Sequence, residues 1–110
     1  MEIWFASARL EKLFNSQSKL RGKYGPRMAG VIQQRLLDLD AVTNLEQMRS
    51  LPGNCHELSQ NLKGLLAVHL VNRDRLAFRP ADDPVPLRDD GSLDWALVTK
   101  IEIVAVGDYH

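Results

Sequence analysis

IEIVAVGDYH, residues 101–110, is the stretch that decides the fold. Its apolar residues alternate with polar or smaller ones, which is typical of a β-strand that packs one face on a core. The pattern predicts a strand, and not a helix, through residues 97–106. We expect Ile101, Ile103 and Ala105 to lie on one face of this strand. The other face would carry Lys100, Glu102, Val104 and Val106.

Three side chains that can carry protons follow Gly107. Continued extended geometry would place Tyr109 on the face of Ile101, with Asp108 and His110 on the other face. Gly107 has no side chain and permits a bend at this point. Periodicity alone therefore leaves two interpretations of these three residues: they are a solvated end of the strand, or they belong to a functional site.

Length and composition predict a single domain spanning residues 1–110. A chain of this size can bury a core without disulfides, and the lone Cys55 cannot form an internal one. The first ten residues, MEIWFASARL, lack the pattern of a signal peptide. The longest apolar run, LLAVHLV at 65–71, is too short to span a bilayer. We therefore expect a reduced, cytoplasmic protein that makes no contact with a membrane.

The formal net charge is zero, which by itself argues against a nucleic-acid-binding protein. However, residues 1–80 carry 12 Lys and Arg against 7 Asp and Glu, whereas residues 81–110 carry 2 against 7. Most of the positive excess lies between Arg9 and Arg35. Because the field at a site depends on local charge, one surface could still attract a polyanion. The alternative interpretation is an ordinary solvated helical face.

The N-terminal half predicts one short strand and two helices. EIWF near the start suits a strand, and Ser7 can cap a short helix behind it. The polar stretch 15–23 follows. A second helix should begin at Gly25 and Pro26, because glycine can cap a helix and proline suits its first turn. The buried stripe of this helix would comprise Met28, Ile32, Leu36 and Leu39.

The second half predicts strands. The strand-like segments are CHELSQ (55–60), LLAVHLV (65–71), RLAFR (75–79) and LVTKIEIVAV (97–106). The last two are separated by an acidic, proline-containing insertion at about 81–95, which we expect to be an exposed loop. Helices first and strands later predict an α+β domain, with two N-terminal helices packed on a largely antiparallel sheet of four to five strands. LLAVHLV and KIEIVAV should be neighbours in that sheet.

Several short motifs occur in a recognisable order. KYGPRM stands at the start of the second helix, LPGNCHEL follows, G.LAV.LV...RLAF covers two strands, and DYH closes the last strand. In this order and spacing, the chain resembles the HigB branch of the RelE-like toxins, the plasmid maintenance killer proteins. The segment DDGSLDWALVTKIEIVAVGDYH is similar to a longer subgroup of that branch. The resemblance thus covers nearly the whole chain.

The resemblance implies a toxin of a type II toxin–antitoxin system. It would be a ribosome-dependent endoribonuclease, an mRNA interferase that enters the ribosomal A site and cuts translated mRNA. Its partners would be the ribosome, the mRNA and a HigA-like helix-turn-helix antitoxin from the same operon, with no cofactor and no metal. The implied catalytic residues are Arg75, Asp108, Tyr109 and His110. The residues expected to contact RNA or the ribosome are Lys19, Arg21, Lys23, Arg27, Lys63 and Arg73.

These residue types suit cleavage of RNA without a metal. The ribose 2′-OH loses its proton, its oxygen attacks the adjacent phosphorus in line, and the 5′-oxygen is protonated as it leaves. An imidazole such as that of His110 titrates near neutral pH, and a terminal carboxylate beside it favours the acid role. Tyr109 can stack on a base or donate to the phosphate, and Asp108 can orient the imidazole. Arg75 would stabilise the charge on the phosphorane.

One loop departs from the family pattern. The family reads HxLKGxRxGxxA where this chain has HELSQNLKGLLA at 56–67. Ser59 and Gln60 replace a Lys-Gly pair, Leu62 replaces an arginine, and Lys63 keeps a cation in the loop. Losing one preorganised charge contact typically costs about 10²- to 10³-fold in rate. The chain could therefore be a catalytically weakened toxin-fold protein that serves as an antitoxin- or ribosome-binding module.

A third possibility is an unrelated small α+β interaction domain that imitates this pattern. Cys55 could meet His56 and His110 at a metal, but the spacing of the three residues is irregular. Structural roles within strands are expected for His56 and His69. We expect Trp4 and Trp95 to be anchors in the core or in a loop, and not platforms on which bases stack.

Overall fold

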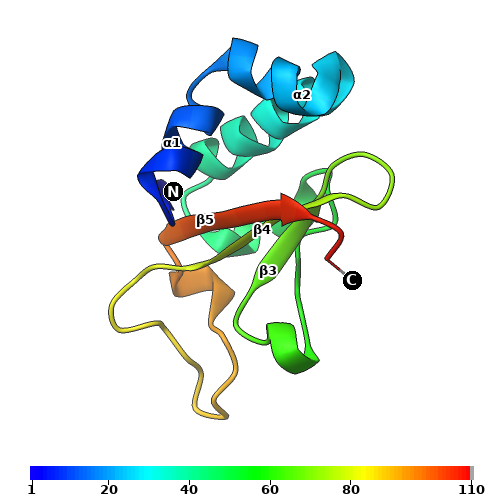
Figure 1. Ribbon diagram of the computed structural model, residues 1–110. Coiled ribbons are helices and arrows are strands. Elements are labelled where there is room, and N and C mark those ends of the chain that lie inside the picture. Colours follow the sequence, from blue (N-terminus) through cyan, green and yellow to red (C-terminus); the bar gives the residue numbers. More distant parts are fainter. Residues whose placement is uncertain (110) are drawn as a thin grey trace.

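The structure, a computed structural model, describes residues 1–109 and has two layers (Figure 1). Helices α1 and α2 lie over one face of a five-stranded sheet. The elements are β1 (Glu2–Phe5), α1 (Ala8–Phe14), α2 (Gln17–Ala41), the 3₁₀ helix η1 (Leu45–Ser50), β2 (His56–Glu57), η2 (Gln60–Leu62), β3 (Leu66–His69), β4 (Arg75–Pro80), η3 (Trp95–Leu97) and β5 (Lys100–Gly107). Within the described range, no helix is both long and apolar enough to cross a membrane.

The strand order of the sheet is β1-β5-β4-β3-β2. The β1–β5 pair is parallel and the other three pairs are antiparallel. The prediction of an α+β domain with a largely antiparallel sheet of four to five strands is therefore confirmed. The predicted adjacency of LLAVHLV and KIEIVAV is wrong, because β4 lies between β3 and β5. β3 pairs with β4 across a short turn, which leaves only the far edge of β4 for β5.

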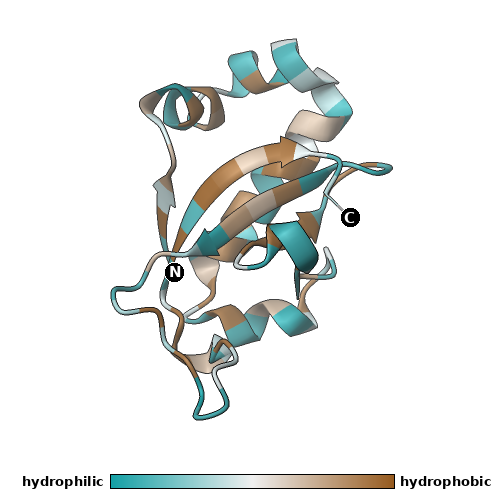
Figure 2. Cartoon of the chain, turned by 60° about the horizontal axis from the view of Figure 1, so that its bottom comes forward, coloured by the Kyte–Doolittle hydropathy of each residue, from teal (hydrophilic) through white to brown (hydrophobic). Residues whose placement is uncertain are grey.

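One face of the sheet forms the core with the helices, and Figure 2 shows the apolar character of its central strands. Burying one such side chain stabilises the fold by about 1.5–3 kcal/mol. Of the stripe predicted on α2, Leu36 is half-buried and the other three residues are buried. The main buried side chains of this core are Met28, Ile32 and Leu39 of α2 and Leu66, Val68, Leu76, Phe78, Ile101 and Ile103 of the sheet.

A β-bulge in β5 changes which of its residues face the core. The register against β4 shifts between Ile103 and Ala105, so Val104 is an extra residue without a partner there. Because side chains alternate, the extra residue moves Ala105 to the face opposite Ile103 and places Val106 on the core side. The predicted common face of Ile101, Ile103 and Ala105 is therefore wrong at Ala105.

α2 consists of two helical segments that meet at Gly25. Gly25 has φ 84° and ψ 161°, a conformation outside the helical range that glycine adopts readily. Pro26 then begins the second segment, as its position predicts. The polar stretch before Gly25 is helical too, from Gln17 onward, which the sequence pattern did not indicate. The Ser16 hydroxyl caps this first segment by accepting a backbone N–H at 3.2 Å, and Leu20 anchors it in the core.

Arg35 connects α2 to two other segments at one end of the sheet. Its Nε donates to the backbone oxygen of His69 at 2.9 Å, and the backbone N–H of His69 donates to the carbonyl of Gly53 at 2.7 Å. Gly53 has φ 114°, and a Cβ added there would lie 2.9 Å from the Nε of Arg35. Both the backbone conformation and the guanidinium therefore require glycine at this position.

The acidic insertion, residues 81–95, leaves the sheet at the end where β5 begins and extends away from α1 and α2 (Figure 1). The carboxylate of Asp82 fixes its base by accepting hydrogen bonds of 2.8–3.2 Å from the backbone N–H and hydroxyl of Thr99 and from the backbone N–H of Lys100. A single bridge between Leu87 and Leu93 closes its outer part. Most of its side chains are exposed.

The two tryptophans differ in their surroundings. Trp95 is a buried anchor, as predicted: its Nε1 donates to Glu57 at 3.0 Å, and the guanidinium of Arg49 lies 3.7 Å from the centre of its ring. Trp4 is 56% exposed, so the anchor prediction is wrong for this residue. The reason is its place on β1, an edge strand whose alternation turns Ile3 and Phe5 toward the helices.

Replacing Gly53 by alanine should test the contact with Arg35. We expect Gly53→Ala to lower the free energy of unfolding by about 2 kcal/mol or more, because it combines a positive φ with displacement of the guanidinium. Gly64→Ala is the matched control, since Gly64 has φ 98° but open space around it. It should cost about 1 kcal/mol through backbone strain alone. Urea unfolding measures both, and equal losses would contradict the role given to Arg35.

Candidate functional site

The face of the sheet opposite the core has a floor of small side chains. His56 of β2 pairs with Ala67 of β3, Ala67 with Ala77 of β4, and Ala77 with Ala105 of β5, so these four residues form one row across the sheet. Ala67 and Ala77 are fully buried but do not belong to the hydrophobic core cluster. Across β3, β4 and β5 this row therefore presents only alanine side chains.

The next row on this open face carries charge. His69 of β3 pairs with Arg75 of β4, and Arg75 pairs with Gly107 of β5. Partners in an antiparallel pair project on the same side, so the imidazole and the guanidinium are neighbours. At the third position Gly107 contributes no side chain and leaves room above β5.

Tyr109 occupies part of the room above Gly107. Its ring lies against the strand, and a Cβ added to Gly107 would come within 3.2 Å of the ring Cε2. The preceding carboxylate, Asp108, forms an ion pair with Arg73 of the β3–β4 turn, with 3.4 Å between Oδ2 and Nε. The predicted face of Tyr109 is therefore wrong: the bulge in β5 brings it to the open face instead of the core face. The fourth predicted catalytic residue, His110, lies outside the described residues.

The β3–β4 turn holds the guanidinium of Arg75 in place. Its Nη1 donates to the backbone oxygens of Asn72 at 3.3 Å and of Asp74 at 3.2 Å, and the side chain is half-buried. The conformation of this turn depends on Asn72, whose φ of 53° lies in the left-handed region that asparagine tolerates. A half-buried arginine held by two carbonyl groups is a fixed positive charge.

His69 is a neighbour of Arg75 on the open face, a position that the sequence pattern did not indicate. Burial and the charges of Arg75 and Arg35 lower the pKa of its imidazole, which favours the neutral ring. A signal was present in the sequence: 69 and 75 lie at equal distances from Asn72. In a hairpin that turns at Asn72, those two positions are opposite one another.

The loop that departs from the family pattern brings no cation from positions 59, 60 or 62 to this face. Ser59 and Gln60 are exposed, and Leu62 is half-buried in η2. Lys63 lines a cavity of about 320 Å³ together with Arg79 and residues of the acidic insertion. Arg79 lies four residues along β4 from Arg75, or about 13 Å in an extended strand. Lys63 thus belongs to the insertion end of the sheet.

The predicted RNA-contacting lysines of α2 belong to a basic groove between the two helices. Lys19 and Lys23 line it together with Arg9, Lys12 and Leu13, and it encloses about 490 Å³. All four cations are exposed. The two arginines predicted with them, Arg21 and Arg27, are also exposed but are not among the lining residues.

One lining residue of the basic groove, Lys23, lies near the β3–β4 turn. Tyr24, next to Lys23 and just before the break in α2, has its pKa raised by burial and then by the charge of Asp74. The ammonium of Lys23 lies 5.5 Å from the centre of the Tyr24 ring. The first segment of α2, which ends at the break at Gly25, therefore has its last residue, Tyr24, near the β3–β4 turn.

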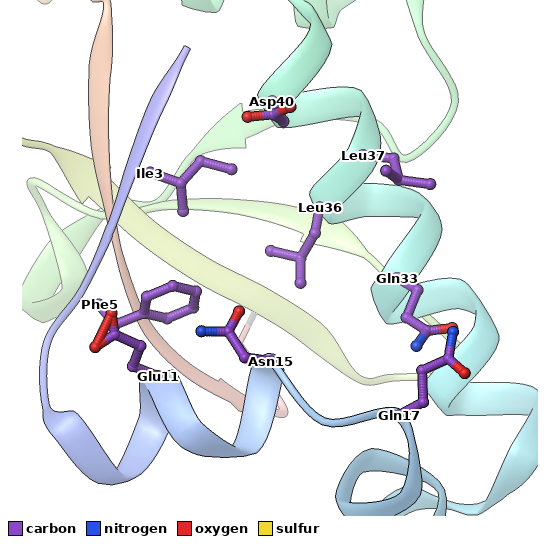
Figure 3. Close-up of a pocket in the computed structure, with 9 residues that line it drawn as sticks. All are labelled: Ile3, Phe5, Glu11, Asn15, Gln17, Gln33, Leu36, Leu37 and Asp40. Carbon is purple, nitrogen blue, oxygen red and sulfur yellow. The ribbon is translucent and has the colours of Figure 1, made fainter.

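A second groove lies between β1, α1 and α2 and encloses about 600 Å³ (Figure 3). Ile3, Phe5 and Leu36 point into it, and two carboxylates, Glu11 and Asp40, stand at its rim. None of the residues predicted for catalysis or RNA contact lines this groove. It is a mixed apolar and acidic surface, distinct in character from the basic groove.

The metal hypothesis for Cys55, His56 and His110 receives no support from the described residues. Cys55 is buried, and burial raises the pKa of its thiol to about 12, although the charge of Arg49 acts in the opposite direction. A metal ligand must be a thiolate, which this environment disfavours. In residues 1–109, no group of three or more His, Cys, Asp or Glu side chains could hold a metal ion.

No protein-family model matches the sequence, and no curated protein sequence matches it. Among solved structures, the chain is similar to a YoeB/ParE toxin from Agrobacterium tumefaciens, with a TM-score of 0.57 and 12% sequence identity. The alignment covers 100% of this chain and 99% of that one. At this identity the likeness concerns the fold, a mixed α+β domain with a five-stranded sheet. It agrees with the sequence resemblance to RelE-like toxins at the level of fold and does not single out the HigB branch.

The environment of Cys55 predicts an unreactive thiol. At pH 8 the folded protein should react with iodoacetamide far more slowly than the urea-unfolded chain, because the thiolate is the nucleophile and a pKa of about 12 leaves almost none of it. Mass spectrometry of time points measures the extent of labelling, with free cysteine at the same pH as the control. Labelling of the folded protein at the unfolded rate would contradict the burial of Cys55.

Proposed function

We propose that this chain is the toxin of a type II toxin–antitoxin system, and that it is a ribosome-dependent endoribonuclease that cuts translated mRNA. The observation that carries the proposal is the charged row on the open face, in which Arg75 is flanked by His69 and by the Tyr109 ring on Gly107. The fold that the chain shares with a YoeB/ParE toxin supports the same proposal. Membership of the HigB branch is part of the proposal and rests on the sequence motifs.

In the proposed reaction, the protein positions one phosphodiester above Arg75. The ribose 2′-oxygen attacks the phosphorus in line, and the 5′-oxygen leaves. Arg75 stabilises the negative charge of the phosphorane, since its guanidinium is already fixed by two carbonyl groups. Tyr109 stacks on a base or donates to the phosphate, and His110 protonates the leaving oxygen. Asp108 supports them from its ion pair with Arg73.

The same proposal assigns RNA and ribosome contacts to cations beside the open face and to cations of the two helices, which cover the other face of the sheet. The basic groove would follow the RNA backbone, because phosphate contacts supply most of the affinity that is independent of sequence. Arg73 stands next to the charged row in the β3–β4 turn. The remaining residues assigned to RNA or the ribosome are Lys19, Lys23, Arg21, Arg27 and Lys63.

A HigA-like helix-turn-helix antitoxin is the proposed protein partner, and the cytoplasm is the proposed location. Both follow from the toxin–antitoxin assignment, because a ribosome-dependent toxin acts where translation occurs. No cofactor or metal is part of the proposed chemistry, since every role is given to a side chain of this chain.

One observation favours a second function, a catalytically weakened toxin-fold protein that binds the antitoxin or the ribosome. The loop residues Ser59, Gln60 and Leu62 place no charge beside Arg75, and Lys63 belongs to the insertion end of the sheet. A site with one fixed arginine in place of several cations stabilises the phosphorane less.

Loss of His110 tests the catalytic assignment. On translating ribosomes, removal of His110 should lower the cleavage rate by about 10²-fold or more, the usual scale of general acid–base catalysis. Arg75→Gln should also lower the rate, by about 10²- to 10³-fold, since it removes the charge that faces the phosphorane. Primer extension on the mRNA measures the rates, and thermal unfolding checks that each variant is folded.

The outcomes separate the two functions. Unchanged cleavage after loss of His110 would remove this residue from the mechanism. Absence of cleavage by the wild type, together with cleavage by Ser59→Lys combined with Leu62→Arg, would establish the weakened binding module. The double substitution restores cations at the two loop positions where the family pattern has them.

The basic groove predicts salt-dependent association with ribosomes. Lys19→Glu with Lys23→Glu should weaken co-sedimentation at low salt by about tenfold or more, because repulsion replaces two phosphate contacts. The matched control is Arg88→Glu with Lys100→Glu, which changes net charge equally but on exposed residues of the acidic C-terminal part. Equal loss of binding in both pairs would show a net-charge effect and contradict the assignment of the groove.

A further inference from the structure

We propose that His69 is the general base that takes the proton from the ribose 2′-OH. This inference rests on the proposed function and adds a residue to which the sequence pattern assigned only a structural role. It follows from three features of the open face: the register of the β3–β4 hairpin, the charges around the imidazole, and the space above Gly107.

The register places His69 at one end of a row of three strands. Its neighbour Arg75 stands in the middle, and Gly107, with the Tyr109 ring over it, stands at the other end. Two strand spacings separate β3 from β5, which is about 10 Å. A phosphodiester seated above Arg75, between His69 and the Tyr109 ring, can present its 2′-OH to His69 within the hydrogen-bond reach of about 3 Å that a general base needs. Arg75 is then centred beneath the phosphorus.

The surroundings of His69 favour a neutral imidazole. Burial lowers its pKa first, and the guanidinium groups of Arg75 on β4 and Arg35 on α2 lower it further. Within residues 1–109, further charged or titratable groups at this end of the sheet include Tyr24, Arg73, Asp74, Asp108 and Tyr109. A base must be unprotonated to act, so a lowered pKa favours the competent form of His69.

The ring of His69 is available, whereas its backbone is fixed. The carbonyl of Gly53 and the Nε of Arg35 bind the backbone N–H and oxygen of His69 at 2.7 and 2.9 Å. Among residues 1–109, no hydrogen bond engages the imidazole itself. The ring of His56, one row away, has its Nδ1 2.7 Å from the backbone oxygen of Asn54. A base with a fixed position and a free ring is preorganised for proton transfer.

The proposed step balances without a cofactor. His69 accepts the proton of the 2′-OH as the bond between O2′ and phosphorus forms. The bond between phosphorus and O5′ breaks, and His110, the acid of the proposed function, gives its proton to O5′. The products are a 2′,3′-cyclic phosphate and a 5′-hydroxyl end, with no change in oxidation state. Exchange with water afterwards returns His69 to the neutral form and His110 to the protonated form.

The test compares His69→Gln with the wild type on translating ribosomes that carry one defined mRNA. Glutamine keeps a polar side chain of similar size but cannot accept the proton. We expect the single-turnover cleavage rate of His69→Gln to be lower than that of the wild type by about 10²- to 10³-fold. The wild-type rate should rise with pH on the acid side of its pH–rate profile, and this rise should be absent in His69→Gln. His56→Gln, the matched control on the same face, should retain the wild-type pH profile. Thermal unfolding and ribosome co-sedimentation should stay unchanged in both variants.

A second measurement separates base from acid. In an mRNA with sulfur in place of the 5′-bridging oxygen at the cleaved bond, the leaving group needs no proton. This substrate should rescue removal of His110 and should not rescue His69→Gln. Imidazole added to His69→Ala should restore part of the rate, which a purely structural histidine would not allow.

Each outcome is decisive. Wild-type cleavage with an unchanged rate and pH profile in His69→Gln overturns this inference and leaves the proposed function standing. Rescue of His69→Gln by the sulfur substrate also overturns it, because the residue would then serve the leaving group. Absence of cleavage by the wild type overturns the proposed function and this inference together. If His69→Gln fails to fold, imidazole rescue of His69→Ala decides the question.

Discussion

The extra residue in β5 determines what each face of the sheet presents. β5 lies between β1 and β4, so its residues from Lys100 to Ile103 must keep a fixed register on both edges. Ile101 and Ile103 then face the core. Without the bulge at Val104, alternation would turn Gly107 and Tyr109 toward the helices as well. The bulge turns them to the open face, where they complete the row that begins at His69.

The contact between the helices and the sheet depends on Arg35. Arg35 is the point at which α2, the loop around Gly53 and the end of β3 meet, since it contacts the backbone of His69 and leaves no room for a side chain at position 53. The same guanidinium contributes to the low pKa of the His69 imidazole. One side chain therefore both holds the strand end in place and helps to lower the pKa of a neighbouring imidazole.

The spatial separation of charge explains how a neutral chain can present a surface suited to a polyanion. The basic groove belongs to the helices and the acidic insertion to the opposite end of the molecule (Figure 1). The insertion is tied to the start of β5 by Asp82, so its carboxylates stay away from the charged row. The electrostatic field at the basic groove can therefore be positive although the net charge of the chain is zero.

The sequence by itself determined the element types, because hydrophobic periodicity and caps are local: the α+β class, the strand character of 101–106, the helix after Pro26 and the largely antiparallel sheet. It also pointed to Arg75 and Tyr109 through motif order. It could not show the neighbours of β5, the helical character of the stretch after Ser16, or the exposure of Trp4. Those depend on which edges and faces remain free once the chain has folded. The pairing of His69 with Arg75 and the displacement of Ala105 by Val104 were decided only by the tertiary structure, because register is a relation between strands that no single segment encodes.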